Sequence, residues 1–188
     1  MASSFRTIEN WFPVAILAVS LGFNVYFLAI PRGAVNPHPT VTGSVAVGKR
    51  VPALAAAELS GRHSLIEWAA DSRPAVLYVF SPSCVWCLKN LPNAKALWAG
   101  CHDRYRFVAL SPTSTGLAEY VAAHALPFQV YSNPVGREGQ AFAVSGTPTT
   151  MVISNGGEVE RLWVGAYTGQ SQEEIQAYFG IALPGIVR

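Results

Sequence analysis

The feature that most limits the fold is a short apolar run that leads straight into a pair of cysteines. Residues 74–80 read PAVLYVF, with β-branched and aromatic side chains and no charge. Such a run is typical of a central strand that is covered on both faces of a sheet. Cys84 and Cys87 follow at once and open a helix-like segment, residues 84–98. The pattern therefore predicts a buried strand directly before a helix that begins at the cysteine pair.

The remainder of the chain alternates between strand-like and helix-like segments. The expected elements are a strand at 105–110, a helix at 116–125, a strand at 127–132, a short helix at 136–145, strands at 149–154 and 158–165, and a helix at 171–180. Residues 58–68 are expected to form a short strand, a turn and a brief helix. The last two strands flank Asn-Gly-Gly, which is a hairpin signal. This order predicts an α/β domain with a mixed central sheet flanked by helices.

A second apolar segment lies near the N-terminus, before the expected domain. Residues 12–30 contain no ionisable side chain, and about 20 such residues are needed to cross a bilayer as a helix. A cleaved signal peptide is the competing interpretation, but the sequence LAIPRGAV places Pro and Arg where small residues are required. We expect a transmembrane anchor at 12–30, after a short tail at 1–11. A Pro- and Gly-rich linker at 31–44 then precedes the domain, 45–188.

Composition excludes several other classes of protein. Hydrophobic residues make up 51% of the chain and charged residues 13%, with a formal net charge of +2. So weak a net charge gives no reason to expect nucleic acid as a partner. The three cysteines are too few, and odd in number, to form a disulfide scaffold. A chemical role for the close pair is therefore favoured.

Cys84 and Cys87 can be read as half a zinc site, an inert bridge or a redox pair. Zinc needs two more ligands, and only Cys101 and His102 follow, without the spacing of a second knuckle. A permanent bridge across so short a loop would stabilise little. At the start of a helix, however, a Cys84 thiolate is favoured by free N–H groups, and Cys87 lies one turn inward. We therefore expect an attacking and a resolving thiol, with no metal.

A second motif, Thr147-Pro148-Thr149 immediately before a strand, extends this interpretation. Together with Cys-x-x-Cys and with Pro92, five residues after Cys87, it resembles the thioredoxin fold. In that fold a cis-proline faces the cysteine pair, and the residue before it pairs with the substrate chain. The resemblance implies that Pro148 is this proline and that Thr147 faces the substrate. Proline is the residue for which a cis peptide bond costs least.

The material between the two motifs makes the resemblance more specific. An extra helix and strand, within residues 111–132, is similar to the βα insertion of membrane-anchored TlpA-type thioredoxin-like proteins, or redoxins. These include reductases of cytochrome c maturation and proteins of methylamine dehydrogenase maturation. The resemblance implies a domain on the extracytoplasmic, periplasmic side of a bacterial plasma membrane, held by a single-pass anchor.

The activity implied by the resemblance is that of a thiol–disulfide oxidoreductase, most simply a protein-disulfide reductase. Cys84 and Cys87 would cycle between dithiol and disulfide bond without any cofactor. The partners would be protein thiols or disulfides, such as apocytochrome c, and a membrane thiol that supplies electrons. Trp86 lies between the cysteines and is expected beside the groove in which a partner docks.

Three residues depart from the resembled pattern. Ser83 stands where many members have Trp, Tyr78 where minimal thioredoxins have a buried acid, and Asn90 where several anchored relatives have Glu. A buried carboxylate can relay the proton of the resolving thiol, so this role is left unassigned.

Two other functions stay open at this point. A thiol peroxidase would carry Pro-x-x-x-Thr/Ser-x-x-Cys, and the chain has Ser81 at the hydroxyl position but Leu77 in place of Pro. A non-catalytic module that binds a metal or a client protein through the same groove is the other alternative.

Overall fold

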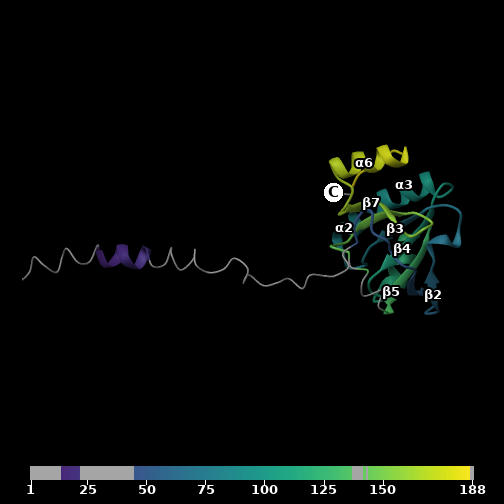
Figure 1. Cartoon of the computed structure of the whole chain (residues 1–188). Coiled ribbons are helices and arrows are strands. Elements are labelled where there is room, and N and C mark those ends of the chain that lie inside the picture. The colour runs from purple at the N-terminus through teal and green to yellow at the C-terminus, as the bar shows by residue number, and fades with distance from the viewer. Residues whose placement is uncertain (1–13, 22–44, 137–141, 143, 187–188) are drawn as a thin grey trace, which may run out of the picture. The chain divides into compact units, whose positions relative to one another are not determined.

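The computed structural model describes residues 14–21, 45–136, 142 and 144–186 (Figure 1). The chain divides into two units, residues 1–40 and 41–188, and each is considered by itself.

In the first unit the described residues form one helical stretch, 14–21. None of the helices in the described ranges is long and apolar enough to cross a membrane. Most of the expected anchor at 12–30 lies outside those ranges, as do the tail at 1–11 and the linker at 31–44. These three assignments stay predictions.

In the second unit seven described strands form one sheet. The strands are β1 Leu54–Glu58, β2 His63–Ile66, β3 Ala75–Val79, β4 Arg106–Ser111, β5 Gln129–Val135, β6 Thr149–Ile153 and β7 Val159–Val164. Their order across the sheet is β2-β1-β5-β4-β3-β6-β7. Strands β3, β4 and β5 run parallel, whereas β6 and β7 on one side and β1 and β2 on the other are antiparallel to their neighbours. The predicted mixed sheet is confirmed.

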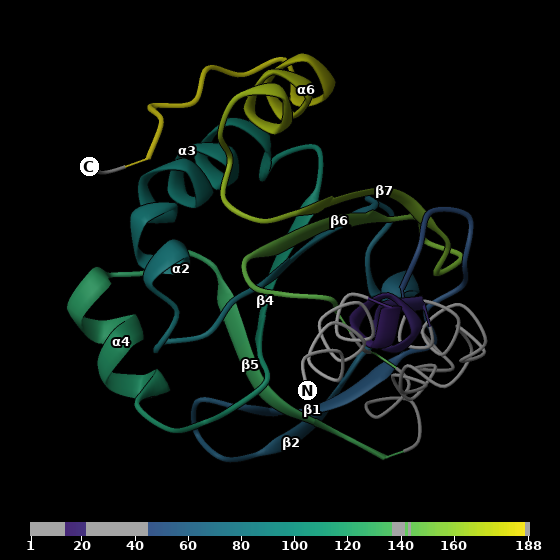
Figure 2. The same ribbon diagram turned by 90° about the vertical axis from the view of Figure 1, so that its left-hand side faces the viewer.

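Strand β3 lies near the middle of the sheet and is buried throughout, as its apolar sequence predicts. The described α-helices of this unit are α2 Val85–Lys89, α3 Leu91–Cys101, α4 Leu117–His124 and α6 Gln170–Phe179. Buried residues of all four share one apolar cluster with alternate side chains of β3, namely Val76, Tyr78 and Phe80 just beyond its end. Figure 2 shows these helices on one side of the sheet. The intervening side chains Leu77 and Val79 enter a second cluster on the other face.

Two local predictions need correction. Residues 63–66 form strand β2 rather than part of a brief helix, because Gly61 adopts a φ of 82° in the turn and lets the chain pair back onto β1. The single expected helix at 84–98 is two helices, which meet at Asn90. Pro92 lies in the first turn of the second helix, where a missing backbone N–H costs nothing. Most of the short helix expected at 136–145 lies outside the described residues.

Candidate active site

The cysteine pair sits where β3 ends and α2 begins. Cys84 is the N-cap of α2, and its Sγ accepts a hydrogen bond from the Cys87 N–H at 3.2 Å. The Cys84 N–H donates to the Ser81 carbonyl at 3.1 Å, which closes the turn between strand and helix. The predicted strand–cysteine–helix arrangement is therefore present, and the sulfur of Cys84 occupies the capping position normally filled by a hydroxyl or carboxylate oxygen.

The two thiols have different surroundings. Cys84 is partly exposed, whereas Cys87 is 1% exposed. Burial acts to raise the pKa of Cys84, but interactions with the side chains of Cys87 and Thr147 and with backbone amides of α2 outweigh it, so this pKa lies below its ordinary value. Burial, reinforced by the hydrogen bond with Cys84, raises the pKa of Cys87 to about 12. At neutral pH the thiolate character of the pair is concentrated on Cys84.

Thr147, the residue before Pro148, lies directly against Cys84, although the two are 63 positions apart in the chain. Antiparallel pairing of β3 with β6, with Val79 opposite Thr149, brings the Thr147-Pro148 segment to the end of β3. The Thr147-Pro148 peptide bond is cis, and the Cys84 thiol donates to the Thr147 carbonyl at 3.3 Å. The structure thus brings together Cys84, Cys87, Thr147 and Pro148, the four residues singled out by the two sequence motifs.

Trp86 lies on the outer side of α2, 54% exposed. Its neighbours Val85 and Leu88 are 64% and 46% exposed. The Lys89 ammonium lies 5.5 Å from the centre of the Trp86 ring, at cation–π distance. We call the three exposed apolar side chains Val85, Trp86 and Leu88 the apolar rim; the first of them directly follows Cys84.

Asn90 has a structural role that sequence reasoning missed. Its side chain is fully buried, and its Oδ1 accepts hydrogen bonds from the Tyr167 N–H at 2.9 Å and from Asn93 Nδ2 at 3.0 Å. The residue therefore ties the junction of α2 and α3 to the segment that follows β7. The available signal was its place three residues after Cys87, which puts both side chains on one helical face.

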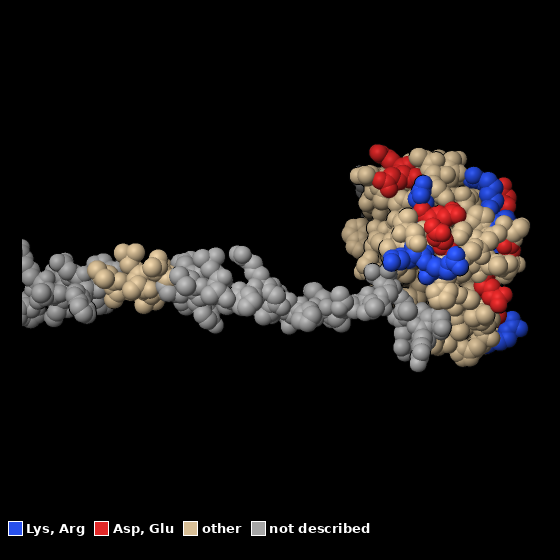
Figure 3. Space-filling model, viewed as in Figure 1, with Lys and Arg blue, Asp and Glu red and all other residues tan. Residues whose placement is uncertain are grey.

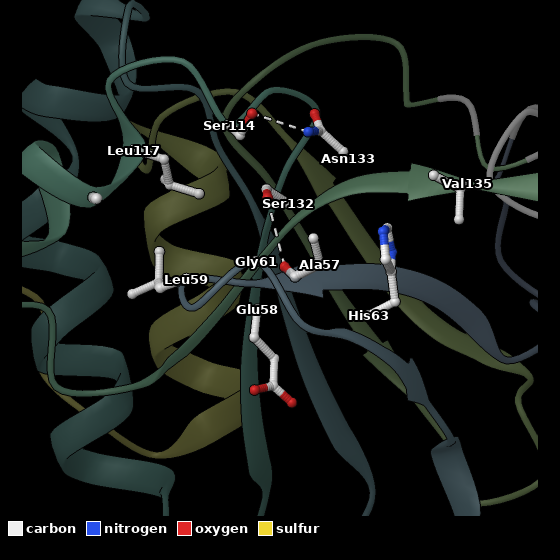
Figure 4. A pocket seen from close by; sticks show the side chains of 11 residues that line it. Ala57, Glu58, Leu59, Gly61, His63, Ser114, Leu117, Ser132, Asn133 and Val135 are labelled. Carbon is white, nitrogen blue, oxygen red and sulfur yellow. Dashed lines mark hydrogen bonds between the residues drawn. The ribbon is translucent and has the colours of Figure 1, made fainter.

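Two further features of the described residues lie apart from the cysteine pair. Cys101, at the end of α3, is fully buried, and burial raises its pKa to about 12. No group of three or more His, Cys, Asp or Glu side chains suited to a metal ion occurs in the described ranges. A pocket of about 340 Å³ lies between β1, β2, β5 and the start of α4 (Figure 4). Its polar side chains include Glu58, His63 and Asn133, and no cysteine lines it.

The difference between the thiols predicts selective alkylation. Iodoacetamide should modify Cys84 alone at pH 7, because Cys87 and Cys101 are buried and each has a pKa of about 12. The rate at which iodoacetamide alkylates Cys84 should rise with pH. Because the pKa of Cys84 is lowered, this rate should level off at a lower pH than the alkylation rate of a free thiol. Mass spectrometry of each cysteine peptide measures this. Earlier modification of Cys87 would show that the exposed and buried roles are reversed.

No protein-family model and no curated protein matches the sequence. Solved structures do match the fold. A protein of Chlorobium tepidum, assigned as a thiol:disulfide interchange protein DsbE, superimposes with a TM-score of 0.59 at 19% identity and covers 72% of this chain and 99% of its own. The thioredoxin domain of a thiol-disulfide oxidoreductase of Bacteroides vulgatus gives 0.58 at 12% identity, with 72% and 99% covered. A secreted Mycobacterium tuberculosis disulfide oxidoreductase homologous to E. coli DsbE gives 0.53 at 20% identity, with 67% and 93% covered. The chain therefore has the thioredoxin-like fold of these thiol–disulfide oxidoreductases.

Proposed function

We propose that the protein is a membrane-tethered thiol–disulfide oxidoreductase that reduces disulfides of protein clients. The observation that supports this most directly is the position of the Cys84 sulfur. It caps α2, receives the Cys87 N–H and lies 3.3 Å from the Thr147 carbonyl. A partly exposed thiol with a lowered pKa next to a buried one with a raised pKa suits an attacking and a resolving thiol.

The reaction has two exchanges. The Cys84 thiolate attacks a client disulfide, forms a mixed disulfide and releases one client thiolate. The Cys87 sulfur then loses its proton and attacks Cys84 Sγ, which releases the second client thiolate and leaves a disulfide between the two cysteines. A thiol donor at the membrane returns the pair to the dithiol.

The client would lie across the Thr147-Pro148 segment. Extended chains bind exposed backbone groups as an added strand would, and the residue before Pro148 offers such groups. The apolar rim of Val85, Trp86 and Leu88 would contact apolar side chains beside the client cysteine. On the face drawn in Figure 3, acidic and basic side chains are interspersed, so that face carries no large patch of one sign.

By the same proposal, residues 12–30 anchor the chain in a bacterial plasma membrane, and the domain faces the periplasmic side. The clients would then be extracytoplasmic proteins that need reduced cysteines, such as apocytochrome c. Two of the superimposable structures are described as DsbE or its homologue, and one of these proteins is secreted, which supports this setting.

A peptide with a Cys-x-x-Cys-His disulfide, the haem-attachment sequence, tests the proposal. The full-length protein with dithiothreitol should reduce this peptide well above the rate with dithiothreitol alone. The Cys84→Ser/Cys87→Ser double variant should show only the background rate. If the double variant were as active as the wild type, a non-catalytic binding role would be the better account. Rapid peroxide consumption by the wild type would instead favour a thiol peroxidase.

Trp86 provides a test of the docking surface. Trp86→Ala should lower kcat/KM for the peptide about tenfold, because a large apolar contact is lost from the apolar rim. The rate of Cys84 alkylation by iodoacetamide should change less than twofold in Trp86→Ala, since that small reagent does not bind to the docking surface. Leu65→Ala is a matched control, because Leu65 is 52% exposed on β2 at the opposite edge of the sheet from β7. Equal effects of both substitutions would argue against a docking role for Trp86.

A further inference from the structure

The surroundings of Cys87 contain buried hydrogen-bonding groups that the fold does not use. The hydroxyl groups of Tyr78 and Tyr120 and the Nδ2 of Asn90 are all buried and make no hydrogen bond, although the Asn90 side chain lies near enough to the Tyr78 hydroxyl to lower its pKa. Unpaired buried polar groups cost free energy, and such groups are few in native proteins. Three of them therefore need an explanation, and the two tyrosines share the buried apolar cluster of Cys87.

The three groups belong to three different elements. Tyr78 belongs to β3, Asn90 ends α2 and Tyr120 belongs to α4. Both tyrosines share an apolar cluster with Cys87, and the Phe80 ring lies 5.8 Å from the Tyr78 ring and 5.6 Å from the Tyr120 ring, centre to centre. Asn90 lies one helical turn after Cys87, so both side chains point from α2 into the core.

Electrostatic effects agree with this placement. Burial raises the pKa of Tyr120 to about 12, and the charges of Cys87 and then Cys84 add to the shift. Burial raises the pKa of Tyr78 well above its ordinary value, and Tyr167 and Cys87 act in the same direction, while the amide of Asn90 opposes them. Both phenol groups therefore stay protonated and can donate hydrogen bonds. Negative charge on the cysteine pair raises their pKa values further.

No carboxylate occurs among the buried polar side chains of the described residues. The buried polar side chains are Asn90, Asn93, Ser111, Ser132, Thr149 and Thr150. The Thr150 and Tyr167 hydroxyl groups are hydrogen-bonded to each other, so the Tyr167 hydroxyl already has a partner. The unpaired donors near Cys87 are thus neutral.

We propose that the Tyr78 and Tyr120 hydroxyls serve the resolving thiol as neutral hydrogen-bond donors, in place of the carboxylate expected there from resemblance. This inference rests on the proposed function, in which Cys87 attacks the mixed disulfide. During that attack the Cys87 S–H bond breaks and negative charge develops on a buried sulfur. The Cys84–Cys87 bond forms, the bond from Cys84 to the client sulfur breaks, and the departing client thiolate takes up the proton. Neutral donors that turn toward the buried sulfur as this charge develops would lower its cost.

The two exchanges can be timed separately with Ellman's reagent, DTNB, and the full-length reduced protein. Attack by Cys84 releases one thionitrobenzoate, and attack by Cys87 on the mixed disulfide releases the second. Wild-type protein should give both phases, whereas a missing second phase would contradict the proposed function itself. In Tyr78→Phe and Tyr120→Phe the second phase should be about tenfold slower, as expected for a hydrogen bond to a charged group. The first phase should stay within threefold of the wild type.

The controls separate this role from a structural one. Because the Tyr120 hydroxyl has no partner and the Tyr78 hydroxyl has only the Asn90 side chain nearby, both Phe variants should unfold close to the wild-type temperature. Tyr131→Phe is the matched control, since Tyr131 is 8% exposed in the apolar cluster on the other face of the sheet, and both of its phases should be unchanged. A normal second phase in Tyr78→Phe and Tyr120→Phe, with two phases present in the wild type, would overturn the inference and leave the proposed function standing.

Discussion

Replacing Cys87 with serine is expected to convert the protein into a trap for its clients. Cys84 remains partly exposed with its sulfur beside Thr147, so the first exchange can proceed. The resolving thiol is gone, and an intramolecular attack cannot be matched by dilute external thiols. Release of the mixed disulfide should slow by at least about a thousandfold, given the effective concentrations of well-placed intramolecular groups.

The trapped species can be counted by non-reducing electrophoresis with the disulfide-linked dimer of a single-cysteine peptide as client, because the released peptide thiol then diffuses away. Cys87→Ser should accumulate about one peptide per protein, released by dithiothreitol. Cys84→Ser is the matched control and should accumulate none, because Cys87 is 1% exposed. Trapping by Cys84→Ser but not by Cys87→Ser would reverse the assigned roles.

Asn90→Ala is expected to lower the free energy of unfolding by about 3 kcal/mol. The substitution removes the acceptor of two hydrogen bonds, one from the Tyr167 N–H and one from Asn93. Each buried donor left without a partner costs roughly 1–3 kcal/mol. The two hydrogen bonds also hold the junction of α2 and α3 against the segment after β7. Their removal should therefore destabilise the region close to the cysteine pair.

Denaturant titration measures this loss as a shift of the midpoint at constant slope. Asn155→Ala is the matched control, since the Asn155 side chain makes one exposed hydrogen bond, to the Ser72 carbonyl at 2.6 Å. We expect that control to cost less than about 1 kcal/mol, because water replaces the lost partner. Equal losses for the two variants would mean that Asn90 does not tie these elements together.

The sequence predicted the elements around the site because their signals are local. The uninterrupted apolar run before Cys84 identified β3, and alternation of strands and helices indicated a mixed sheet. The approach of Thr147 to Cys84 depends on how β3 pairs with β6. That pairing joins segments far apart in the chain, so it followed from a resemblance between motifs and not from any local pattern.

The role of Asn90 could not be derived in the same way. Its partners include the backbone of Tyr167, 77 residues away, and no periodicity encodes such a contact. From sequence it was only a position without the expected acid. Likewise Tyr78 was noted from sequence only as standing where minimal thioredoxins have a buried acid, and its unpaired hydroxyl became visible only with the core assembled. Strand β2 was missed because a glycine turn and pairing with β1 outweighed weak local signals.

The most direct test of the account is the equilibrium reduction potential of the Cys84–Cys87 pair in the full-length protein, measured against dithiothreitol or glutathione. Strong oxidants of this chemistry owe their potential to a stabilised reduced form. Here the pKa of Cys84 is lowered, which favours its thiolate, whereas burial raises the pKa of Cys87 to about 12 and keeps that thiol protonated. Charge stabilisation of the reduced form is thus confined to one cysteine, and the proposed reductase role predicts a value near or below the thioredoxin range of roughly −270 mV. A value near −120 mV would contradict the account, because the protein would then install disulfides rather than reduce them.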